Sequence, residues 1–411
     1  MCMKARSDIS NLMTSDVHVI GGGLGGLVAA ALVARAGRTV TVHEGRGRLG
    51  GRATTDAKDG FHFNQGPHAL YLGGEATRTL RSLGITPSGR SPNTKGGQIA
   101  IGDRVGLAPG GPMSLLRSPM LGWRDKLDLG KAMGRLPRLD PAALAAVSVR
   151  EWVASMSSRT RVCDVLHSVI RLATYTNAPD DLSAEIALTQ LQMALGDGVI
   201  YLDRGWVQFV DALAANPSIR FVHDDHVGEL PDAPTVIVAT GGPQAATKLT
   251  GVHFGVGPPA NVSVLDVGLA RPPRHEFVLG IDPPMYLSNH GFPDEMTPAG
   301  CSSVSVAEYL TPETHPDRDR LRGFLAHAGV ETDAIMTERY LHRMTAVSAI
   351  ATSATGGLHG RPATVVPGRP GVFVVGDWVG PRGHLLDAVL ASAHDAALGA
   401  IAHLDRLPAI R

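Results

Sequence analysis

Residues 16–44, DVHVIGGGLGGLVAAALVARAGRTVTVHE, carry the clearest structural signal in the chain. A short β-branched strand at 17–20 leads into a glycine turn, which is followed by an Ala-, Leu- and Val-rich helix and a second strand at 39–43. Three glycines stand in G-x-G-x-x-G register: Gly21, Gly23 and Gly26. In a strand–helix–strand unit these positions allow a tight turn, close approach of a pyrophosphate and close helix–strand packing. The stretch therefore predicts a dinucleotide-binding unit.

The residues around this unit add groups that suit an anionic dinucleotide. The first turn of the helix, beginning near Leu24, offers free N–H groups and the positive end of a dipole. Glu44 follows the second strand 18 residues after Gly26, close to the spacing at which a carboxylate accepts hydrogen bonds from ribose hydroxyls. The segment GRGRLGGRATT at 45–55 then places three arginines among four glycines, which suits contacts between guanidinium groups and phosphate.

Length and composition indicate a globular protein of about two domains. The chain has 411 residues, of which 44% are hydrophobic and 18% charged, and this composition excludes wholesale disorder. Because 38 Lys and Arg residues balance 38 Asp and Glu residues, no net field attracts nucleic acid, and we expect no nucleic-acid partner. The cysteines, Cys2, Cys163 and Cys301, have neither disulfide nor metal-ligand spacing, which favours a cytoplasmic location and no bound metal.

Two segments bear on localisation. Residues 1–12 lack the continuous apolar stretch of a signal peptide, so we expect a loose leader, with Met13 as a second candidate for the start. No apolar run approaches the roughly 18–20 residues that cross a bilayer. Residues 111–139 combine Met, Leu and Trp123 with six basic residues against two acidic ones. We interpret this segment as a surface helix or an active-site lid, and the alternative is a peripheral contact with a membrane surface.

The rest of the chain alternates between two kinds of pattern. Amphipathic segments from 73 to 202 predict a mostly helical insertion, and β-rich runs at 253–350 predict a sheet covered by helices. Alternating strands and helices return after residue 203 and near the C-terminus. We predict an α/β fold in which a Rossmann-like composite domain is interleaved with an α+β substrate domain that holds a mixed sheet. The expected boundaries are 13–75, 203–250 and 356–411 for the first domain, and 76–202 and 251–355 for the second.

Three separated blocks resemble the FAD-dependent amine oxidase and phytoene desaturase superfamily. They are VIGGGLGGL with EGRGRLGGR, GWVQFVDAL with VGEL and VIVATGG, and GVFVVGDWVG with GHLLDAVLASA. The blocks cover under half of the chain and occur in the family's order. The resemblance implies a two-domain fold that binds FAD in the first strand–helix–strand unit. No Cys or His lies in a motif that would attach a flavin covalently, so we expect FAD to bind non-covalently.

The resemblance also implies which residues contact FAD. The motif glycines, Gly51 and Arg52 would lie at the pyrophosphate, Glu44 and Arg46 at the adenosine. Val227 would touch adenine, and Asp377 would hold the ribityl chain. The full predicted set is Gly21, Gly23, Leu24, Gly25, Gly26, Glu44, Gly45, Arg46, Gly50, Gly51, Arg52, Gly66, Pro67, His68, Val227, Thr240, Gly241, Gly376, Asp377, Leu385, Leu386 and Val389.

Candidate catalytic residues follow from the same alignment of motifs. His68 stands in QGPHALY, where family members pass the flavin ring, and an ordinary imidazole pKa near 6.5 suits proton transfer. A packed, non-catalytic histidine is the alternative. His384 is another catalytic candidate, and the alternative is a residue that simply stands at a helix start. A helix beginning near it would aim its positive dipole end at the flavin and favour hydride acceptance. Further candidates are Tyr71, His342, Met344 and Arg382, and Asn64 stands where the family often has Asp.

Two absences bear on the substrate. Family amine oxidases usually place a lysine near the flavin, yet no lysine follows Lys248, and the stretch 341–362 has no aromatic residue to frame an amine. We therefore favour hydride transfer between the flavin and an apolar, isoprenoid-like small molecule, in C–C desaturation, saturation or isomerisation. An amine or amino-acid oxidase that releases peroxide is one alternative. A non-catalytic lipid-binding escort protein of the same fold is another. The direction of transfer, the electron acceptor and the oligomeric state stay open.

Overall fold

A parallel sheet forms the first layer of the computed structural model, which describes residues 15–66, 69–290 and 296–408. In spatial order its strands are β10 (Ile219–Val222), β2 (Val40–His43), β1 (Val17–Ile20), β11 (Thr235–Val238) and β17 (Val372–Val374). Neighbouring strands run parallel throughout, with Val19 opposite Val42 on one side and Ile237 on the other. The three central strands are buried along their whole length, which explains their continuous apolar sequence.

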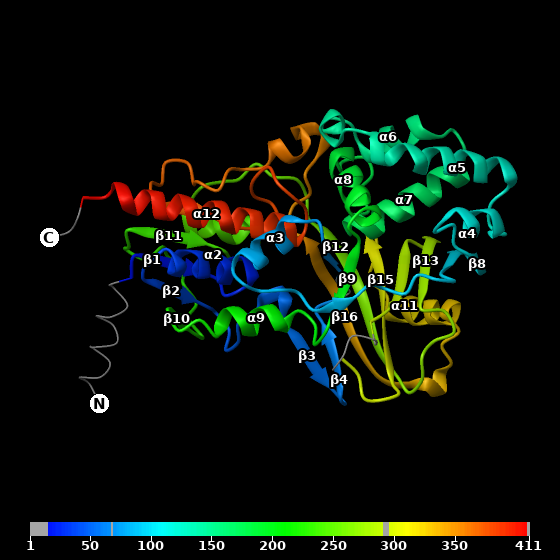
Figure 1. Cartoon of the computed structure of the whole chain (residues 1–411), viewed down its shortest axis with the longest axis horizontal. Coiled ribbons are helices and arrows are strands. Elements are labelled where there is room, and N and C mark those ends of the chain that lie inside the picture. The colour runs from blue at the N-terminus through cyan, green and yellow to red at the C-terminus, as the bar shows by residue number, and fades with distance from the viewer. Residues whose placement is uncertain (1–14, 67–68, 291–295, 409–411) are drawn as a thin grey trace.

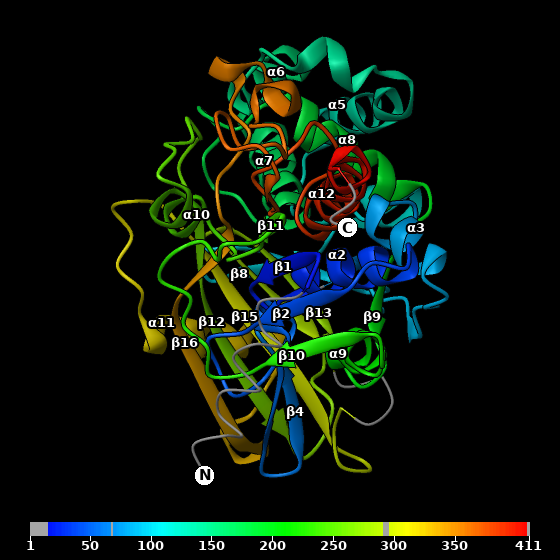
Figure 2. The same ribbon diagram turned by 90° about the vertical axis from the view of Figure 1, so that its left-hand side faces the viewer.

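Helices α2 (Leu24–Arg35) and α12 (Leu386–Arg406) lie together on one side of this sheet (Figure 2). Ala, Leu and Val side chains of both helices fill the space above the strands. α12 begins two residues after the predicted start at His384, because Leu385 adopts a left-handed φ of 52°. Three further helices complete this part: α3 (Glu75–Ser82), α9 (Val207–Ala214) and α10 (Pro243–Thr250).

A seven-stranded mixed sheet forms the second layer (Figure 1). Its strands are, in order, β16 (Ile335–Val347), β12 (Ala260–Leu269), β15 (Ser302–Leu310), β14 (Met285–Asn289), β13 (Phe277–Asp282), β7 (Gln98–Ile101) and β8 (Arg104–Leu107). Only β13 and β7 pair in parallel. Helix α11 (Arg318–Phe324) packs against one face through Leu321 and Phe324. The predicted fold class, a Rossmann-like α/β part with an interleaved α+β part, is confirmed.

Five helices pack together beside the second sheet. They are α4 (Pro112–Arg117), α5 (Trp123–Arg135), α6 (Val149–Met156), α7 (Thr160–Thr174) and α8 (Ala184–Leu195). Their shared core includes Trp152, Val165 and Leu188. The prediction of a mostly helical insertion is right for this region, but residues 98–107 form the hairpin β7–β8. Its turn contains Gly102 at φ +55°, and the hairpin joins the second sheet.

Short strands join the two layers. β3 (Thr55–Lys58) pairs with β4 (Phe61–Asn64), and β9 (Val199–Leu202) pairs with β5 (Leu70–Tyr71) and β6 (Gly89–Arg90). All strands of the parallel sheet fall inside the predicted segments 13–75, 203–250 and 356–411, while the boundaries themselves stay a prediction. None of the described helices combines the length and apolar character needed to cross a bilayer. The expected leader at 1–12, and Met13, lie outside the described residues.

Candidate functional site

The glycine turn between β1 and α2 keeps the backbone unusually close to its neighbours. Gly21 has φ +109°, and a Cβ there would lie 2.4 Å from the carbonyl oxygen of Ala239. A Cβ on Gly26 would lie 1.9 Å from the carbonyl oxygen of Gly21. No side chain caps α2 at Gly23, so N–H groups of its first turn remain available to an anion. The turn therefore offers the close backbone approach that a pyrophosphate requires.

A second glycine segment lies against this turn. The N–H of Gly50 donates to the carbonyl oxygen of Gly22 at 2.8 Å, and both Gly50 and Gly51 have positive φ values, 114° and 55°. Leu24 and Gly25 are buried at the start of α2, where a Cβ on Gly25 would lie 2.8 Å from side chains of Val375 and Val389. Two of the three sequence blocks thus meet at the start of α2.

Glu44 lies at the carboxyl end of β2 with its carboxylate fixed by backbone groups. Its Oε2 accepts a hydrogen bond from the N–H of Gly22 at 2.8 Å, and its Oε1 accepts one from the N–H of Arg46 at 2.9 Å. A carboxylate has about four lone-pair sites, so it retains capacity to accept from hydroxyl groups. A Cβ on Gly45 would lie 2.8 Å from the ring of His226, which brings the half-buried Val227 toward the same edge.

Arg52 and Asp377, 325 residues apart in the chain, form an ion pair of 3.1 Å between Nη1 and Oδ2. The Asp377 side chain is 1% exposed, and its Oδ2 also accepts from the N–H of Ser348 at 3.0 Å. Arg361 donates to the carbonyl oxygen of Asp377 at 2.9 Å, and burial lowers the pKa of this guanidinium to about 10. Sequence reasoning missed Ser348 and Arg361, because neither stands in a motif.

Several buried polar atoms beside this ion pair have no partner within the described part of the chain. They are Oδ1 of Asp377, Oγ1 of Thr240 and Nε1 of Trp378. A Cβ on Gly376 would lie 2.4 Å from that Trp378 nitrogen, and Gly241 is exposed next to Thr240. A buried polar group without a partner is costly, so these atoms indicate a polar ligand. Their acceptor and donor chemistry fits the hydroxyl-bearing chain and the ring of FAD.

Tyr71 and His384 meet at the C-terminal end of α7. The hydroxyl of Tyr71 donates to the carbonyl oxygen of Ala173 at 3.0 Å, and Nε2 of His384 donates to that of Thr174 at 2.9 Å. Burial raises the pKa of Tyr71 and lowers the pKa of His384 to about 4. Both side chains are therefore neutral near pH 7. Their catalytic role stays a prediction.

The remaining predicted cofactor residues lie at two places. Leu385, Leu386 and Val389 are half-buried at the start of α12, and Gly66, with φ +78°, follows β4. A Cβ on Gly66 would lie 2.6 Å from Cε of Met344, so the candidate Met344 adjoins this segment. Two predicted residues, Pro67 and His68, lie outside the described residues.

The other candidates, His342 and Arg382, make their side-chain contacts away from the ion pair of Arg52 with Asp377, and their catalytic role stays a prediction. His342 is exposed on β16, and Arg382 pairs with Glu75 at 3.0 Å and Asp395 at 2.6 Å. The Oδ1 of Asn64 accepts hydrogen bonds from Thr55 Oγ1 and from the N–H of Trp206. Among residues 15–66, 69–290 and 296–408, no group of three or more His, Cys, Asp or Glu could hold a metal ion.

An apolar wall with three tyrosines lies between α7 and the second sheet. Its buried members are Val262, Val264, Leu279, Tyr286, Ala307 and Tyr309, and its half-buried members include Val169, Leu172, Tyr175, Leu341, Met344 and Ala346. The hydroxyls of Tyr175 and Tyr286 are hydrogen-bonded at 3.0 Å, and the Tyr286 and Tyr309 rings stack. Sequence reasoning missed these aromatics, because Tyr175 at the end of α7 and Tyr286 and Tyr309 on β14 and β15 all lie outside the 341–362 stretch.

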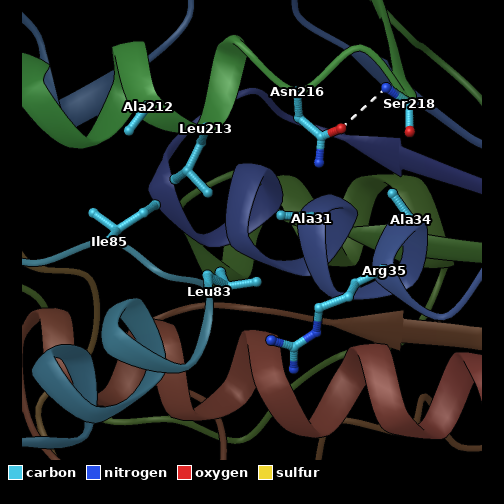
Figure 3. Close-up of a pocket in the computed structure, with 9 residues that line it drawn as sticks. All are labelled: Ala31, Ala34, Arg35, Leu83, Ile85, Ala212, Leu213, Asn216 and Ser218. Atoms are coloured by element: carbon cyan, nitrogen blue, oxygen red, sulfur yellow. Dashed lines mark hydrogen bonds between the residues drawn. The ribbon is translucent and has the colours of Figure 1, made fainter.

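A cavity of about 230 Å³ lies elsewhere, between α2, α9 and the loop after α3 (Figure 3). Small and apolar side chains such as Ala31, Leu83 and Leu213 line it, together with Arg35. The Asn216 side chain accepts from the N–H of Ser218 at 3.0 Å. No predicted cofactor residue lines this cavity. We therefore place the candidate site at the glycine turn and Asp377, not here.

Asp387 gives the site region a pH-dependent stability. It is 3% exposed in α12, its Oδ1 accepts from the N–H of Ala76 at 2.8 Å, and burial, with repulsion from Glu75, raises its pKa to about 6. The unfolded carboxyl titrates near 3.8, so the stability contributed by this group is complete below pH 4 and lost as pH rises through 6.

Asp387→Asn keeps the acceptor oxygen and removes the buried charge. We expect it to raise the free energy of unfolding at pH 8 by about 1–3 kcal/mol and to leave it unchanged at pH 4. Urea denaturation at both pH values measures this difference. Asp405→Asn, on the exposed end of α12, is the control, because its surface pair with Arg38 contributes little. An equal gain at pH 4 would contradict the expectation.

Parts of the chain are similar in sequence to a known protein family and to curated proteins. Residues 24–228 match a family model described as flavin containing amine oxidoreductase. A carotenoid 3,4-desaturase of Haloarcula japonica is 49% identical over 59 residues, which are 14% of this chain and 12% of that protein. A hydroxysqualene dehydroxylase of Rhodopseudomonas palustris is 47% identical over 66 residues, 16% of each chain. The chain thus matches only about one eighth to one sixth of the length of these relatives.

Solved structures match over nearly the whole chain at low identity. A putative protoporphyrinogen oxidase from Exiguobacterium sp. superimposes with a TM-score of 0.70 at 14% identity, covering 96% of this chain and 99% of that one. A putrescine oxidase bound to putrescine gives a TM-score of 0.66 at 15% identity, covering 94% and 99%. These similarities establish the shared fold.

Proposed function

Because the chain belongs to the FAD-dependent amine oxidase and phytoene desaturase superfamily, we propose that it is an FAD-dependent oxidoreductase that acts on carbon–carbon bonds of an apolar, isoprenoid-like substrate. Desaturation, saturation and isomerisation of such a substrate all fit this proposal. The isoprenoid substrates named for the two partial relatives, a carotenoid and hydroxysqualene, support it.

The surroundings of Asp377 carry the proposal. Its unpartnered carboxylate oxygen and the Thr240 hydroxyl would hold the ribityl chain, while Arg52 and the first turn of α2 would hold the pyrophosphate. Bound FAD supplies an acceptor for hydrogen removed from carbon. Non-covalent binding is supported because the described cysteines lie elsewhere: Cys163 Sγ donates to the carbonyl oxygen of Ser157, and Cys301 lies near Met336.

The residues beside this site suit an apolar substrate. The wall between α7 and the second sheet consists mainly of Val, Leu and Met side chains, and its Met344 adjoins Gly66 of the predicted flavin segment. Tyr71 and His384 bond to the last carbonyls of α7 and so position that helix against the site. Neither requires a charge in this role. His68 remains the proposed residue for proton transfer.

A flavin amine oxidase is the second candidate, and the tyrosines of the wall favour it. Tyr175, Tyr286 and Tyr309 place three aromatic rings in the same wall as Met344, and aromatic faces attract cations. The shared fold with a putrescine oxidase agrees with this candidate. A non-catalytic lipid-binding escort is supported less, because Glu44, Arg52 and Asp377, which would hold a dinucleotide, are all present in the chain.

The visible absorption spectrum of the purified protein tests the proposal. We expect flavin bands near 450 nm that pass into the supernatant after heat denaturation, since the cofactor is held non-covalently. Anaerobic bleaching is then measured with a panel of polyenes and a panel of amines. Bleaching by polyenes alone supports the proposal, and bleaching by amines with peroxide release supports the second candidate. A colourless protein that does not bind added FAD would overturn both.

A further inference from the structure

The helices α4 and α5 expose an unusual number of large apolar side chains. The exposed fractions are 59% for Met113, 67% for Leu116, 67% for Trp123 and 57% for Leu127. These four are among the ten exposed large hydrophobic side chains of the described residues, and they include the two most exposed, Leu116 and Trp123. Both helices lie at the end of the molecule away from its termini (Figure 1). We call the surface formed by residues 112–138 the α4–α5 surface.

The same surface is strongly basic. The basic side chains are Arg117, Arg124, Lys126, Lys131, Arg135 and Arg138, and all except the half-buried Lys126 are exposed. The two acidic residues of the segment are turned to other partners: Asp125 pairs with Arg159 at 3.1 Å, and Asp128 accepts from Ser157 Oγ. The positive charges are therefore not neutralised within the surface.

The helix periodicity places the apolar and basic groups side by side. Trp123, Leu127 and Lys131 follow at i, i+4 and i+8 on α5, opposite the buried Leu129 and Ala132. The Arg124 guanidinium lies 5.1 Å from the centre of the Trp123 ring. α4 adjoins this face, because Lys126 Nζ donates to the carbonyl oxygen of Leu116 at 2.7 Å. One face of α5 thus carries the Trp123 and Leu127 side chains with the cations of Arg124 and Lys131 beside them.

We infer that the α4–α5 surface docks on an anionic lipid bilayer, with the apolar side chains entering the headgroup region and the cations contacting lipid phosphates. Amphipathic helices that lie on membranes combine Trp and Leu on one face with Lys and Arg beside it. A second copy of this chain would present the same positive charge, so charge complementarity favours an anionic partner. The inference does not depend on the proposed reaction.

Tryptophan fluorescence gives a direct test on the flavin-loaded protein. Of the four tryptophans, Trp152, Trp206 and Trp378 are buried, and Trp123 alone is exposed. Vesicles of phosphatidylcholine with an equal amount of phosphatidylglycerol, carrying brominated acyl chains, should therefore quench Trp123. We expect quenching and co-sedimentation with these vesicles at low salt, and much weaker binding to vesicles of phosphatidylcholine alone.

Matched variants separate the two kinds of contact. Arg124→Gln, Lys131→Gln and Arg135→Gln together should weaken binding to anionic vesicles about a hundredfold, at about fivefold per charge. Leu127→Ser should weaken it severalfold, whereas Leu398→Ser, which is 54% exposed on α12, should not. Visible absorbance checks that each variant retains flavin, so a failed vesicle test leaves the proposed function standing. Absence of binding, or a dimer in light scattering that Leu127→Ser dissociates, would overturn the inference.

Discussion

Gly21→Ala is expected to lower the free energy of unfolding by about 3 kcal/mol and to abolish flavin retention. Two costs add at this position. An alanine would have to adopt φ +109°, and its Cβ would lie 2.4 Å from the carbonyl oxygen of Ala239. Neither Gly21 nor Ala239 can move easily, because hydrogen bonds hold both backbones. The N–H of Gly21 donates to the carbonyl oxygen of His43, and the N–H of Ala239 donates to that of Ile20, each at 2.8 Å.

The loss of flavin follows from the same contact. Relief of the clash must shift the turn that begins α2, and this shift displaces the N–H groups that would bind the pyrophosphate. Gly134→Ala is the matched control, since Gly134 is an exposed helical position in α5 with nothing within 4 Å of the added Cβ. Gly134→Ala should raise the free energy of unfolding by up to about 1 kcal/mol. Urea denaturation and the absorbance of the purified proteins measure both quantities. Wild-type stability with full flavin content in Gly21→Ala would refute the argument.

Local signals explain why the first layer was predictable from sequence. A buried parallel strand is apolar throughout, so the sequences of Val17–Ile20 and Val40–His43 predict strands by themselves. The turn between them requires glycine, so the glycine motif predicts the turn. The start of α12 was predicted only to within two residues. A positive φ is usually indicated by glycine in the sequence, but here the residue that adopts it is Leu385.

Contacts between segments far apart in the chain were harder to predict from the sequence. Ser348 and Arg361 hold Asp377 through a backbone N–H and through a bond to its backbone carbonyl, so no motif identifies them. The tyrosines of the apolar wall come from α7's end and from two strands of the second sheet, and only the tertiary fold brings them together. Residues 98–107 were assigned to a helical region, yet their partner β13 lies far along the chain.

Arg339→Met is expected to lower the free energy of unfolding by about 3–5 kcal/mol at pH 8, because it leaves a buried carboxylate without its cation. The Arg339 guanidinium bonds Asp266 Oδ2 at 2.6 Å and Asp56 Oδ2 at 2.9 Å. Asp266 is 1% exposed and its pKa is raised by burial, with Ser305 Oγ as another donor at 2.5 Å. Since Asp56 belongs to β3, this arginine joins the strand pair before Gly66 to the second sheet.

The pH dependence and two controls identify the cause. Without Arg339, the raised pKa of Asp266 rises further. The loss in the free energy of unfolding should therefore be largest at pH 8 and should shrink as the pH falls toward the pKa of this carboxyl in the unfolded chain. Arg339→Met combined with Asp266→Asn should recover much of the loss, because Asn keeps an acceptor for Ser305 and removes the charge. Arg271→Met, which breaks the exposed pairs with Glu331 and Asp333, should lower the free energy of unfolding by less than about 1 kcal/mol. Denaturation of all three proteins at pH 5 and pH 8 measures these differences, and an equal loss at both pH values would show that packing, rather than the unpaired carboxylate, is responsible.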